Sequence, residues 1–389
     1  MVDLLYIDPG SGSYMVQALV AAVLGAFFWV RTSWKGSLEK QSVVFYAESR
    51  HYYQYYEKLV TDLLEKKVKI LYITSDAQDP LRQSAPPGMQ VMHVKWTLAV
   101  LFKKIKSDVM IMTMPDLDNY LFKRSEAVGK YIYMFHAAVS THQQYSKEAF
   151  FNYDAVFCTG AYQEKELRQA EELYQQREKD LVSYGYPLLD TIKGQAHLDS
   201  KQVILIAPSW FDGCIFDTCI EELLLQLSKL PFEVVLRYHP EYKKRKKQDY
   251  LRVNQLLKSY PNMMIDEEPD VLKTLTTADF LITDRSGIAL EYAFGTHKPV
   301  LFIDTKLKQT NPNADELEIE PIENSIRTAI GISIAPGKLT ELPQKIKELE
   351  NRADEFANKM EPLKRSLFFN SPSSYQRGVD YVLQHIKQA

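Results

Sequence analysis

The sequence has little cysteine, no excess of charge of either sign and no repeat of short period. Its three cysteines, Cys158, Cys214 and Cys219, have neither the number of a disulfide framework nor the CxxC spacing of a zinc site. Lys and Arg number 47 against 50 Asp and Glu, and the net charge of −3 excludes a protein held on nucleic acid by a global positive field. The few cysteines predict a protein of a reducing compartment without a structural metal. The balanced charge predicts that any anion-binding site is formed by a few residues and not by the surface as a whole.

The composition is that of a folded globular protein. Of its 389 residues, 46% are hydrophobic and 25% are charged, and this length predicts two to three domains. Aromatic residues make up 12% and are mostly Tyr and Phe, which predicts a large core. A disordered or fibrous protein is therefore excluded.

An apolar run near the N-terminus extends from Tyr14 to Val30 and contains one polar side chain in seventeen residues. This length is the lower limit for crossing about 30 Å of hydrocarbon. The acidic residues Asp3 and Asp8 precede the run, whereas the basic residues Arg31 and Lys35 follow it, which predicts that the rest of the chain is cytoplasmic. The sequence therefore predicts a single N-terminal anchor in the cytoplasmic membrane. The alternative is a helix that lies flat on the bilayer or is buried against the protein.

Beyond this run, strands and helices are predicted to alternate in two series. In the first series, apolar runs rich in β-branched and aromatic residues predict buried parallel strands at 42–48, 69–75, 90–94, 108–114, 130–136 and 155–160. The second series predicts strands at 202–207, 233–238, 263–266, 280–284 and 299–304. Helical periodicity lies between them, as a βαβ series requires.

The short polar segment 194–200 is the predicted linker between two doubly wound domains. A polar helical tail, 339–387, closes the chain. Two Rossmann-like halves with a terminal helix that returns across their junction are the glycosyltransferase B (GT-B) arrangement, so the predicted fold class is α/β of GT-B type with an N-terminal membrane helix. The predicted divisions are a membrane anchor, two Rossmann-like domains and the end of the C-terminal helix, at 1–36, 37–195, 196–375 and 376–389.

Candidate ligand-binding residues lie where the predicted strands end, because open parallel sheets bind ligands at the carboxyl edge. After the strand that ends at Asp284, Ser286 and Gly287 are predicted to open a helix, so their backbone N–H groups and the helix dipole favour a phosphate. Arg285 would add charge, and Glu291, one turn later, is placed to bind ribose hydroxyls. The alternative is an ordinary helix capped by Asp284 or Ser286, with Glu291 solvated.

A second cluster, VVLRYHP, delivers Arg237 and His239 to the same sheet edge. Two residues apart on a strand, these side chains point to the same side and can both contact a pyrophosphate. Pro240 is predicted to end the strand. The alternative for His239 alone is a turn residue.

A third cluster, IYMFHAAVSTHQQY, places His136 at the end of a first-domain strand, facing the cleft between the domains. A neutral imidazole there suits a general base for an acceptor hydroxyl. His142 is a weaker second candidate. The alternative for His136 is a core histidine bonded to a backbone carbonyl. No Asp-x-Asp cluster stands near these three sets of loops, so no metal is predicted.

These clusters resemble the CDP-glycerol glycerophosphotransferase family of teichoic acid and capsule polysaccharide biosynthesis, over about residues 105–375. The family has a His-Gly pair, an Arg-x-His-Pro element, a Thr-Asp-Tyr-Ser-Ser segment and a following Phe-Asp. The corresponding residues are His136-Ala137, Arg237-Tyr238-His239-Pro240, Thr283-Asp284-Arg285-Ser286-Gly287 and Leu290-Glu291, with Lys298-Pro299, GYPLLD at 185–190 and APSW at 207–210 also similar. The sequence departs from the family pattern at Ala137, Arg285 and Gly287.

The resemblance implies a transferase whose first domain takes the acceptor and whose second takes a CDP-activated donor, with no further cofactor. It implies His136 as the base, with His239 and Arg237 on the pyrophosphate, and Ser286 and Glu291 on phosphate and ribose. Thr283, Asp284, Arg285 and Gly287 would belong to the donor site, and His142, Ser209 and Lys298 are additional candidates. The donor would be CDP-glycerol or another CDP-polyol, with CMP as the leaving group.

The implied acceptor is a lipid-linked or polymer hydroxyl at the cytoplasmic membrane. The segment KWTLAVLFKKIK at 95–106 is typical of a basic amphipathic helix facing the membrane, or alternatively of a normal domain helix with solvated lysines.

Other functions stay open: a GT-B glycosyltransferase or epimerase that uses another nucleotide sugar, or a non-catalytic membrane-tethered relative. The oligomeric state is not indicated.

Overall fold

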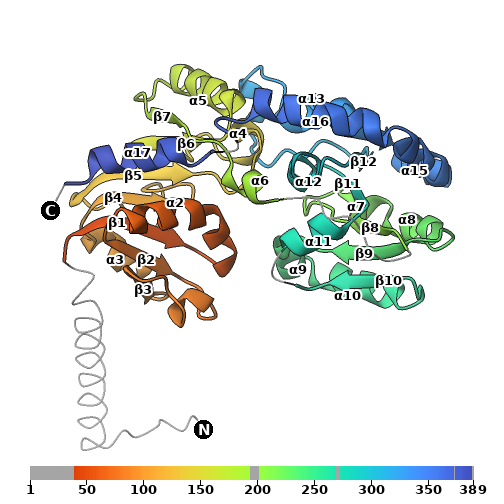
Figure 1. The fold of residues 1–389 in the computed structure, drawn as a ribbon, viewed down its shortest axis with the longest axis horizontal. Coiled ribbons are helices and arrows are strands. Elements are labelled where there is room, and N and C mark those ends of the chain that lie inside the picture. Colours follow the sequence, from red (N-terminus) through yellow and green to blue (C-terminus); the bar gives the residue numbers. More distant parts are fainter. Residues whose placement is uncertain (1–38, 193–200, 269–270, 372, 388–389) are drawn as a thin grey trace, which may run out of the picture.

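The computed structural model describes residues 39–192, 201–268, 271–371 and 373–387. In this part of the chain two wholly parallel sheets lie side by side, each between layers of helices, with α6 (Pro187–Thr191) between them (Figure 1). The predicted anchor and linker lie outside the described residues. Among the described helices, none is long and apolar enough to cross a membrane.

The first sheet has seven strands in the order β3-β2-β1-β4-β5-β6-β7. Its strands are β1 (Gln41–Ala47), β2 (Ile70–Thr74), β3 (Met89–His93), β4 (Ser107–Met112), β5 (Val128–Met134), β6 (Ala155–Cys158) and β7 (Asp180–Ser183). The second sheet has the order β10-β9-β8-β11-β12-β13. Its strands are β8 (Val203–Ile206), β9 (Glu233–Arg237), β10 (Met263–Asp266), β11 (Phe280–Thr283), β12 (Val300–Ile303) and β13 (Gly331–Ile334).

The helices join and cover these strands. Those of the first half are η1 (Arg50–Tyr52), α2 (Tyr53–Glu65), η2 (Pro80–Arg82), α3 (Leu98–Lys104), α4 (Thr141–Gln144), α5 (Ala161–Leu173) and α6. The second half has α7 (Ile215–Thr218), α8 (Ile220–Leu227), α9 (Pro240–Arg245), α10 (Lys247–Leu257), α11 (Val271–Thr277), α12 (Ile288–Thr296), η3 (Ala314–Glu316), α13 (Ile322–Ser325) and α14 (Arg327–Ile330). The tail forms η4 (Pro336–Glu341), α15 (Leu342–Asn351), α16 (Ala353–Leu367) and α17 (Gln376–His385).

The central strands are apolar on both faces because helices cover both faces of each sheet. In β1, Val44 and Tyr46 belong to one hydrophobic cluster, whereas Val43 and Phe45 belong to the cluster on the opposite face. The same alternation runs through β2, β4, β5 and β6, since a parallel register aligns residues of one face. Burial of both faces makes each of these strands apolar at successive positions, and this is why the apolar runs correctly predicted them.

Both sheets have the strand order of a doubly wound fold, with the topological switch beside the first strand of each half. The sequence analysis missed one outer strand in each sheet, β7 and β13. The predicted single tail is three α-helices, and the last of them, α17, returns to the first sheet and packs on α2 and β7 (Figure 1).

The chain that leads to α17 crosses from one domain to the other close to Gly160 and Gly185. A Cβ atom at Gly160 would collide with the carbonyl oxygen of Leu367, and one at Gly185 with that of Phe369. Gly185 also has a φ of +93°, a conformation that favours glycine. Both glycines therefore allow the close crossing.

Helix α3 corrects the interpretation of 95–106 as a membrane-facing amphipathic helix. Leu98, Leu101, Phe102 and Ile105 are buried in the core of the first domain. The apolar stripe therefore faces the sheet, and the exposed residues of this segment are Trp96, Val100 and the lysines.

Candidate active site

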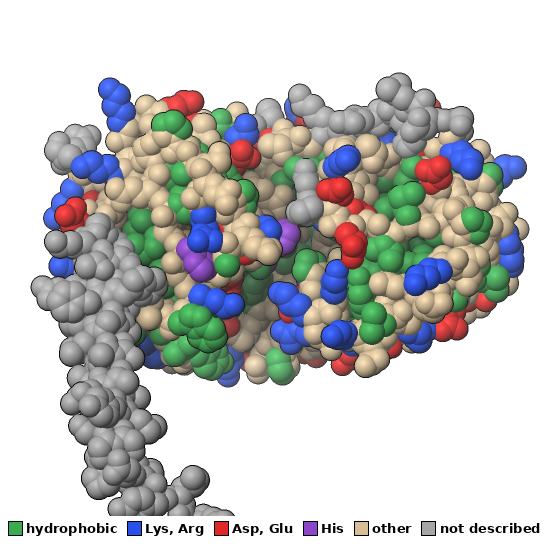
Figure 2. Space-filling view, turned by 90° about the horizontal axis from the view of Figure 1, so that it is seen from below, with side chains coloured by type: hydrophobic (Ala, Val, Ile, Leu, Met, Phe, Trp, Pro, Cys, Tyr) green, Lys and Arg blue, Asp and Glu red, His purple; other side chains and the backbone are tan. Residues whose placement is uncertain are grey.

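The carboxyl edges of both sheets meet at the junction of the two domains. Direct hydrogen bonds cross this junction: the Ser140 backbone N–H donates to Glu323 at 3.1 Å, and the Tyr186 hydroxyl donates to Glu291 at 2.6 Å. Seen from below, the molecule is hollowed near its middle, with His side chains at the hollow and Lys and Arg along its rim (Figure 2). This junction holds most of the predicted site residues.

His136 follows β5 and lies against two tyrosines of the first domain. Its ring centroid is 5.0 Å from that of Tyr52 and 6.1 Å from that of Tyr55, both in edge-on geometry. Burial lowers the pKa of His136 to about 4, so the imidazole is neutral at neutral pH. Its Nδ1 is buried and makes no hydrogen bond to any described residue. The alternative of a histidine bonded to a backbone carbonyl through Nδ1 is therefore not what the structure shows.

His239 faces the same junction from the second domain. It is the N-cap of α9, and its Nδ1 accepts a hydrogen bond from the Glu241 backbone N–H at 3.2 Å. An accepting Nδ1 leaves the proton of the neutral ring on Nε2. Burial, followed by the positive charge of Lys308, lowers the pKa of His239 to about 3. Pro240 is the first residue of α9, where its missing N–H costs nothing, and does not simply end the strand.

Arg237 reaches the same edge at the end of β9 but already has a partner. Its Nη1 donates to Oδ2 of Asp266, the last residue of β10, at 2.5 Å. Asp266 also accepts a hydrogen bond from the Glu268 backbone N–H. No other N–H of Arg237 bonds to a described residue, so the ion pair fixes the guanidinium and leaves donors over for an anion.

The side chains of Thr283 and Asp284, which were predicted for the donor site, are engaged within the protein. The Thr283 hydroxyl donates to the Ala207 carbonyl at 2.7 Å. The buried carboxylate of Asp284 accepts the backbone N–H groups of Ser209, Ile215 and Arg285, at 2.7–3.0 Å. Both side chains therefore tie the loop after β8 to the loop after β11, and Ser209 is held there with its own hydroxyl buried and unpartnered among the described residues.

Ser286 and Gly287 lie at the start of α12, as predicted. Gly287 is the N-cap and provides no side chain, and the Ser286 hydroxyl bonds to no described residue. The backbone N–H groups of both residues likewise have no partner in the described chain, so they can receive an anion. A Cβ at Gly287 would lie 2.9 Å from Cγ1 of Val139 in the first domain. Glycine at this departure from the family pattern therefore allows the two domains to approach closely.

Arg285, another departure from the family pattern, turns away from Ser286. Its Nη1 donates to Asn324 at 2.8 Å and its Nη2 to the Thr305 carbonyl at 3.2 Å. Its Nε is buried and has no partner among the described residues. Arg285 therefore supports the loop after β12 and retains one unused donor.

Glu291 is buried at the domain junction, and its carboxylate does not point into an open ribose site. Oε1 accepts the Tyr186 hydroxyl at 2.6 Å, and the same hydroxyl lies 3.3 Å from the His136 carbonyl oxygen. Burial raises the pKa of Glu291 to about 7. The residue predicted for ribose binding instead joins α12 to the first domain, beside the candidate base.

The raised pKa of Glu291 has a consequence for stability. The pKa is about 7 in the folded chain against 4.5 for an ordinary Glu, so the unfolded chain loses this proton at lower pH. Relative to a Glu291→Gln variant, the free energy of unfolding of the wild type is expected to fall between about pH 4.5 and pH 7, by up to roughly 3 kcal/mol, and to level off above. Urea unfolding of both proteins across this range measures the difference; parallel curves would contradict it.

His142 is a junction residue and lies outside the candidate catalytic pair. Its Nε2 lies 3.1 Å from the Ile319 carbonyl oxygen of the second domain, and its Nδ1 lies 3.4 Å from Oε1 of Glu166. Burial alone lowers the pKa of His142, but Glu166 and the Ile319 carbonyl outweigh it, so the pKa is raised. Its role is to hold the two domains together.

Lys298 lies at the wrong edge of the sheet for a ligand, which corrects its prediction as an additional site residue. It precedes β12, and its Nζ donates to the Ala278 carbonyl at 2.8 Å and lies 3.7 Å from Asp279, which precedes β11. Residues before parallel strands meet at the amino edge, opposite the ligand edge. Lys298 therefore stabilises the sheet from its far side.

Two residues at the junction were missed by the sequence analysis. Tyr186 supplies the hydroxyl that joins Glu291 to the His136 backbone, and Lys308 lies in the loop after β12. The signal for Lys308 was its place after a parallel strand, at the carboxyl edge. Tyr186 lies in the GYPLLD segment, but only the tertiary structure brings it to Glu291.

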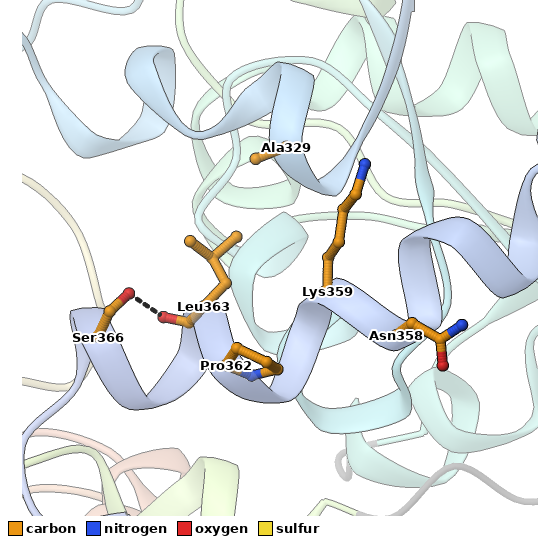
Figure 3. Close-up of a pocket in the computed structure, with 6 residues that line it drawn as sticks. All are labelled: Ala329, Asn358, Lys359, Pro362, Leu363 and Ser366. Carbon is orange, nitrogen blue, oxygen red and sulfur yellow. Dashed lines mark hydrogen bonds between the residues drawn. The ribbon is translucent and has the colours of Figure 1, made fainter.

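A separate hollow of about 440 Å³ lies between α14 and α16, lined by Ala329, Asn358, Lys359, Pro362, Leu363 and Ser366 (Figure 3). Its lining has no histidine or carboxylate, and Lys359 pairs with Glu355 of its own helix. It therefore lacks the groups that acid–base chemistry needs. Within the described residues, no group of three or more His, Cys, Asp or Glu side chains is placed to hold a metal ion.

Known structures with the same two-domain fold include the wall teichoic acid polymerase TagF, with a TM-score of 0.58 and 16% identity over 97% of this chain and 98% of that chain. S. aureus MnaA with UDP gives 0.58 and 14% over 90% and 98%. A UDP-GlcNAc 2-epimerase of Methanocaldococcus jannaschii, in complex with UDP-GlcNAc and UDP, gives 0.53 and 12% over 89% and 99%. At these identities the likeness shows the GT-B type of fold alone.

No curated protein matches the chain in sequence. The family model of the CDP-glycerol:poly(glycerophosphate) glycerophosphotransferases, however, matches residues 28–312, well over half of the chain. The chain therefore belongs to this family of enzymes.

Proposed function

We propose that the chain transfers glycerol phosphate, or a similar polyol phosphate, from a CDP-activated donor to a hydroxyl of a lipid-linked or polymer acceptor, and releases CMP. The observation that carries the proposal is the family match over residues 28–312. It is supported by His136 and His239, one from each domain, at the carboxyl edges of both sheets. The proposed reaction needs no cofactor beyond the donor itself.

In the proposed mechanism, His136 accepts the proton of the acceptor hydroxyl as its oxygen attacks the β-phosphorus of the donor. A bond forms from the acceptor oxygen to this phosphorus, the bond to the bridging oxygen breaks, and CMP leaves with the electron pair. The low pKa of His136 keeps its ring neutral and able to accept a proton. The negative charge of a bound donor would raise that pKa and stabilise the imidazolium as it forms.

His239 would act on the donor side. With Nδ1 engaged by the Glu241 N–H, Nε2–H is the donor that remains for the diphosphate. The free N–H groups of Ser286 and Gly287 at the start of α12 would add further donors where negative charge develops. Because these hydrogen-bond donors are already in position before the reaction, they can stabilise the charge on the leaving CMP without a rearrangement of the site.

We propose that the enzyme works at the cytoplasmic face of the membrane. Trp96 is 91% exposed beside α3, and Lys103, Lys104 and Lys106 form no ion pairs with described residues. The first described strand begins beside Lys106, since the Gln41 backbone N–H donates to the Lys106 carbonyl, and the predicted anchor at 14–30 precedes this strand in the sequence. Lysines and an exposed indole suit an anionic lipid surface.

The proposed function is tested by CMP release from detergent-solubilised full-length protein. The donors are CDP-glycerol and CDP-ribitol, with UDP-sugars as controls, each with and without a membrane lipid extract. We expect release from a CDP-polyol only, and only when the extract is present. Turnover of a UDP-sugar without acceptor would contradict the transferase and favour an epimerase, and folded protein inactive with every donor would favour a binding protein.

A further inference from the structure

The loop after β12 bridges the two domains. At its start, the Thr305 carbonyl accepts a hydrogen bond from the guanidinium of Arg285. At its end, the backbone N–H groups of Thr310 and Asn311 both donate to the Gln143 carbonyl of α4 in the first domain, at 3.0 and 3.2 Å. The segment 304–311, here called the bridging loop, is therefore held at both ends, and Lys308 lies between them.

Lys308 is a half-buried cation without a hydrogen-bond or ion-pair partner among the described residues. It lines a small interdomain pocket together with Arg285 and Glu323. The carboxylates of Glu323 and Asp284 act on its charge without bonding it, and the charge of Lys308 in turn lowers the pKa of His239. A lysine half-buried at a site edge without a carboxylate at bonding distance suits an anionic ligand.

Unused hydrogen-bond donors surround the same place. The side-chain oxygens of Ser209 and Thr305 and the Nε of Arg285 are buried without a partner in the described chain. These groups lie on loops that are bonded to one another. The Ser209 backbone N–H donates to Asp284, and the Arg285 guanidinium donates to the Thr305 carbonyl. Native proteins seldom leave several buried donors unpaired in one place, and phosphate oxygens would accept from all of them.

We propose that Lys308 binds the diphosphate of the nucleotide donor, with the Ser286 hydroxyl and the free N–H groups at the start of α12 on the other side of the anion. The assignment rests on the proposed function. The negative charges of Glu323 and Asp284 act on Lys308, and Lys308 acts on His239; all three residues belong to the second domain, which favours the donor over a phosphate of the acceptor. Because the bridging loop is bonded to α4, a donor held by Lys308 also supports the closed junction next to His136.

The test compares Lys308→Ala, Lys308→Arg and, as a matched control, Lys306→Ala, which removes an exposed lysine from the same loop. In Lys308→Ala we expect the KM for the CDP-polyol to rise by about tenfold to a hundredfold, as for a lost charge-assisted hydrogen bond. The KM for the acceptor should stay unchanged, arginine should restore most of the loss, and Lys306→Ala should behave as the wild type. Lys308→Gln keeps the length of the side chain and serves if alanine disturbs the loop.

A second arm measures binding of inorganic pyrophosphate to the full-length chain by calorimetry. Loss of affinity in Lys308→Ala but not in Lys306→Ala is expected, whichever nucleotide the donor carries. This arm therefore reports on Lys308 even if the CMP-release assay contradicts the proposed function. Equal pyrophosphate affinity in wild type and Lys308→Ala would overturn the proposal, as would an effect confined to the KM for the acceptor.

Discussion

Replacing His136 by alanine is expected to lower kcat for CMP release by roughly two to four orders of magnitude, the usual contribution of a general base. The ring is neutral at neutral pH because burial lowers its pKa, and its Nδ1 bonds to no described residue. The loss should appear equally in kcat and in kcat/KM, because a general base stabilises the transition state and does not contribute to binding of the substrate.

The control for this variant is His385→Ala, which removes a histidine from α17, on the first sheet and away from the junction. Both variants should keep the thermal unfolding temperature of the wild type within a few degrees, since His136 makes no side-chain hydrogen bond to a described residue. Wild-type turnover by folded His136→Ala would remove the proposed mechanism.

His239 caps α9 through Nδ1 and is proposed to donate to the diphosphate through Nε2. Two substitutions are expected to remove these functions separately. Asparagine places an acceptor where Nδ1 caps α9, whereas glutamine reaches the position of Nε2 and can donate to the diphosphate. We expect His239→Asn to lose kcat by about a hundredfold to a thousandfold, as when an oxyanion donor is removed, while keeping stability. His239→Gln should keep more activity but lose about 1 kcal/mol of unfolding free energy with the cap.

The measurements are single-turnover CMP release and urea unfolding of both variants beside the wild type. His239→Ala, which lacks both groups, should combine the two losses. If asparagine retained activity and glutamine did not, the contribution of His239 would be to the loop conformation, and contact with the donor would be excluded.

Prediction from the sequence succeeded best for the strands. In a doubly wound sheet a central strand is covered on both faces, so it must be apolar throughout, and that requirement is visible in the sequence as at 202–207 and β8. The outer strands β7 (DLVS) and β13 (GISI) lack this signal because each has only two large apolar residues in its four positions. For α3 the pattern was ambiguous: an apolar stripe can face a core or a membrane, and only the packing of Leu98 and Phe102 decides.

The site was predicted unevenly for a related reason. His136, His239 and Ser286 follow parallel strands, and strand direction alone brings such residues to the ligand edge. Thr283, Asp284 and Arg285 also follow a strand, but a residue type does not reveal whether the protein itself uses its polar atoms. Lys298 shares the motif but precedes its strand, so its place is the opposite edge.

The sequence by itself determined the α/β fold class, the family and which polar residues lie at the ends of the strands, because buried strands and strand-end motifs are local patterns. The tertiary structure decided which polar groups are used within the protein and which remain for a ligand. It pairs Arg237 with Asp266, Glu291 with Tyr186 and His142 with Glu166, and gives Lys308 no partner in the part of the chain that it describes. Such partners are distant in the sequence: neighbouring elements of one domain bring together Arg237 with Asp266 and His142 with Glu166, whereas only the packing of the two domains brings Tyr186 to Glu291.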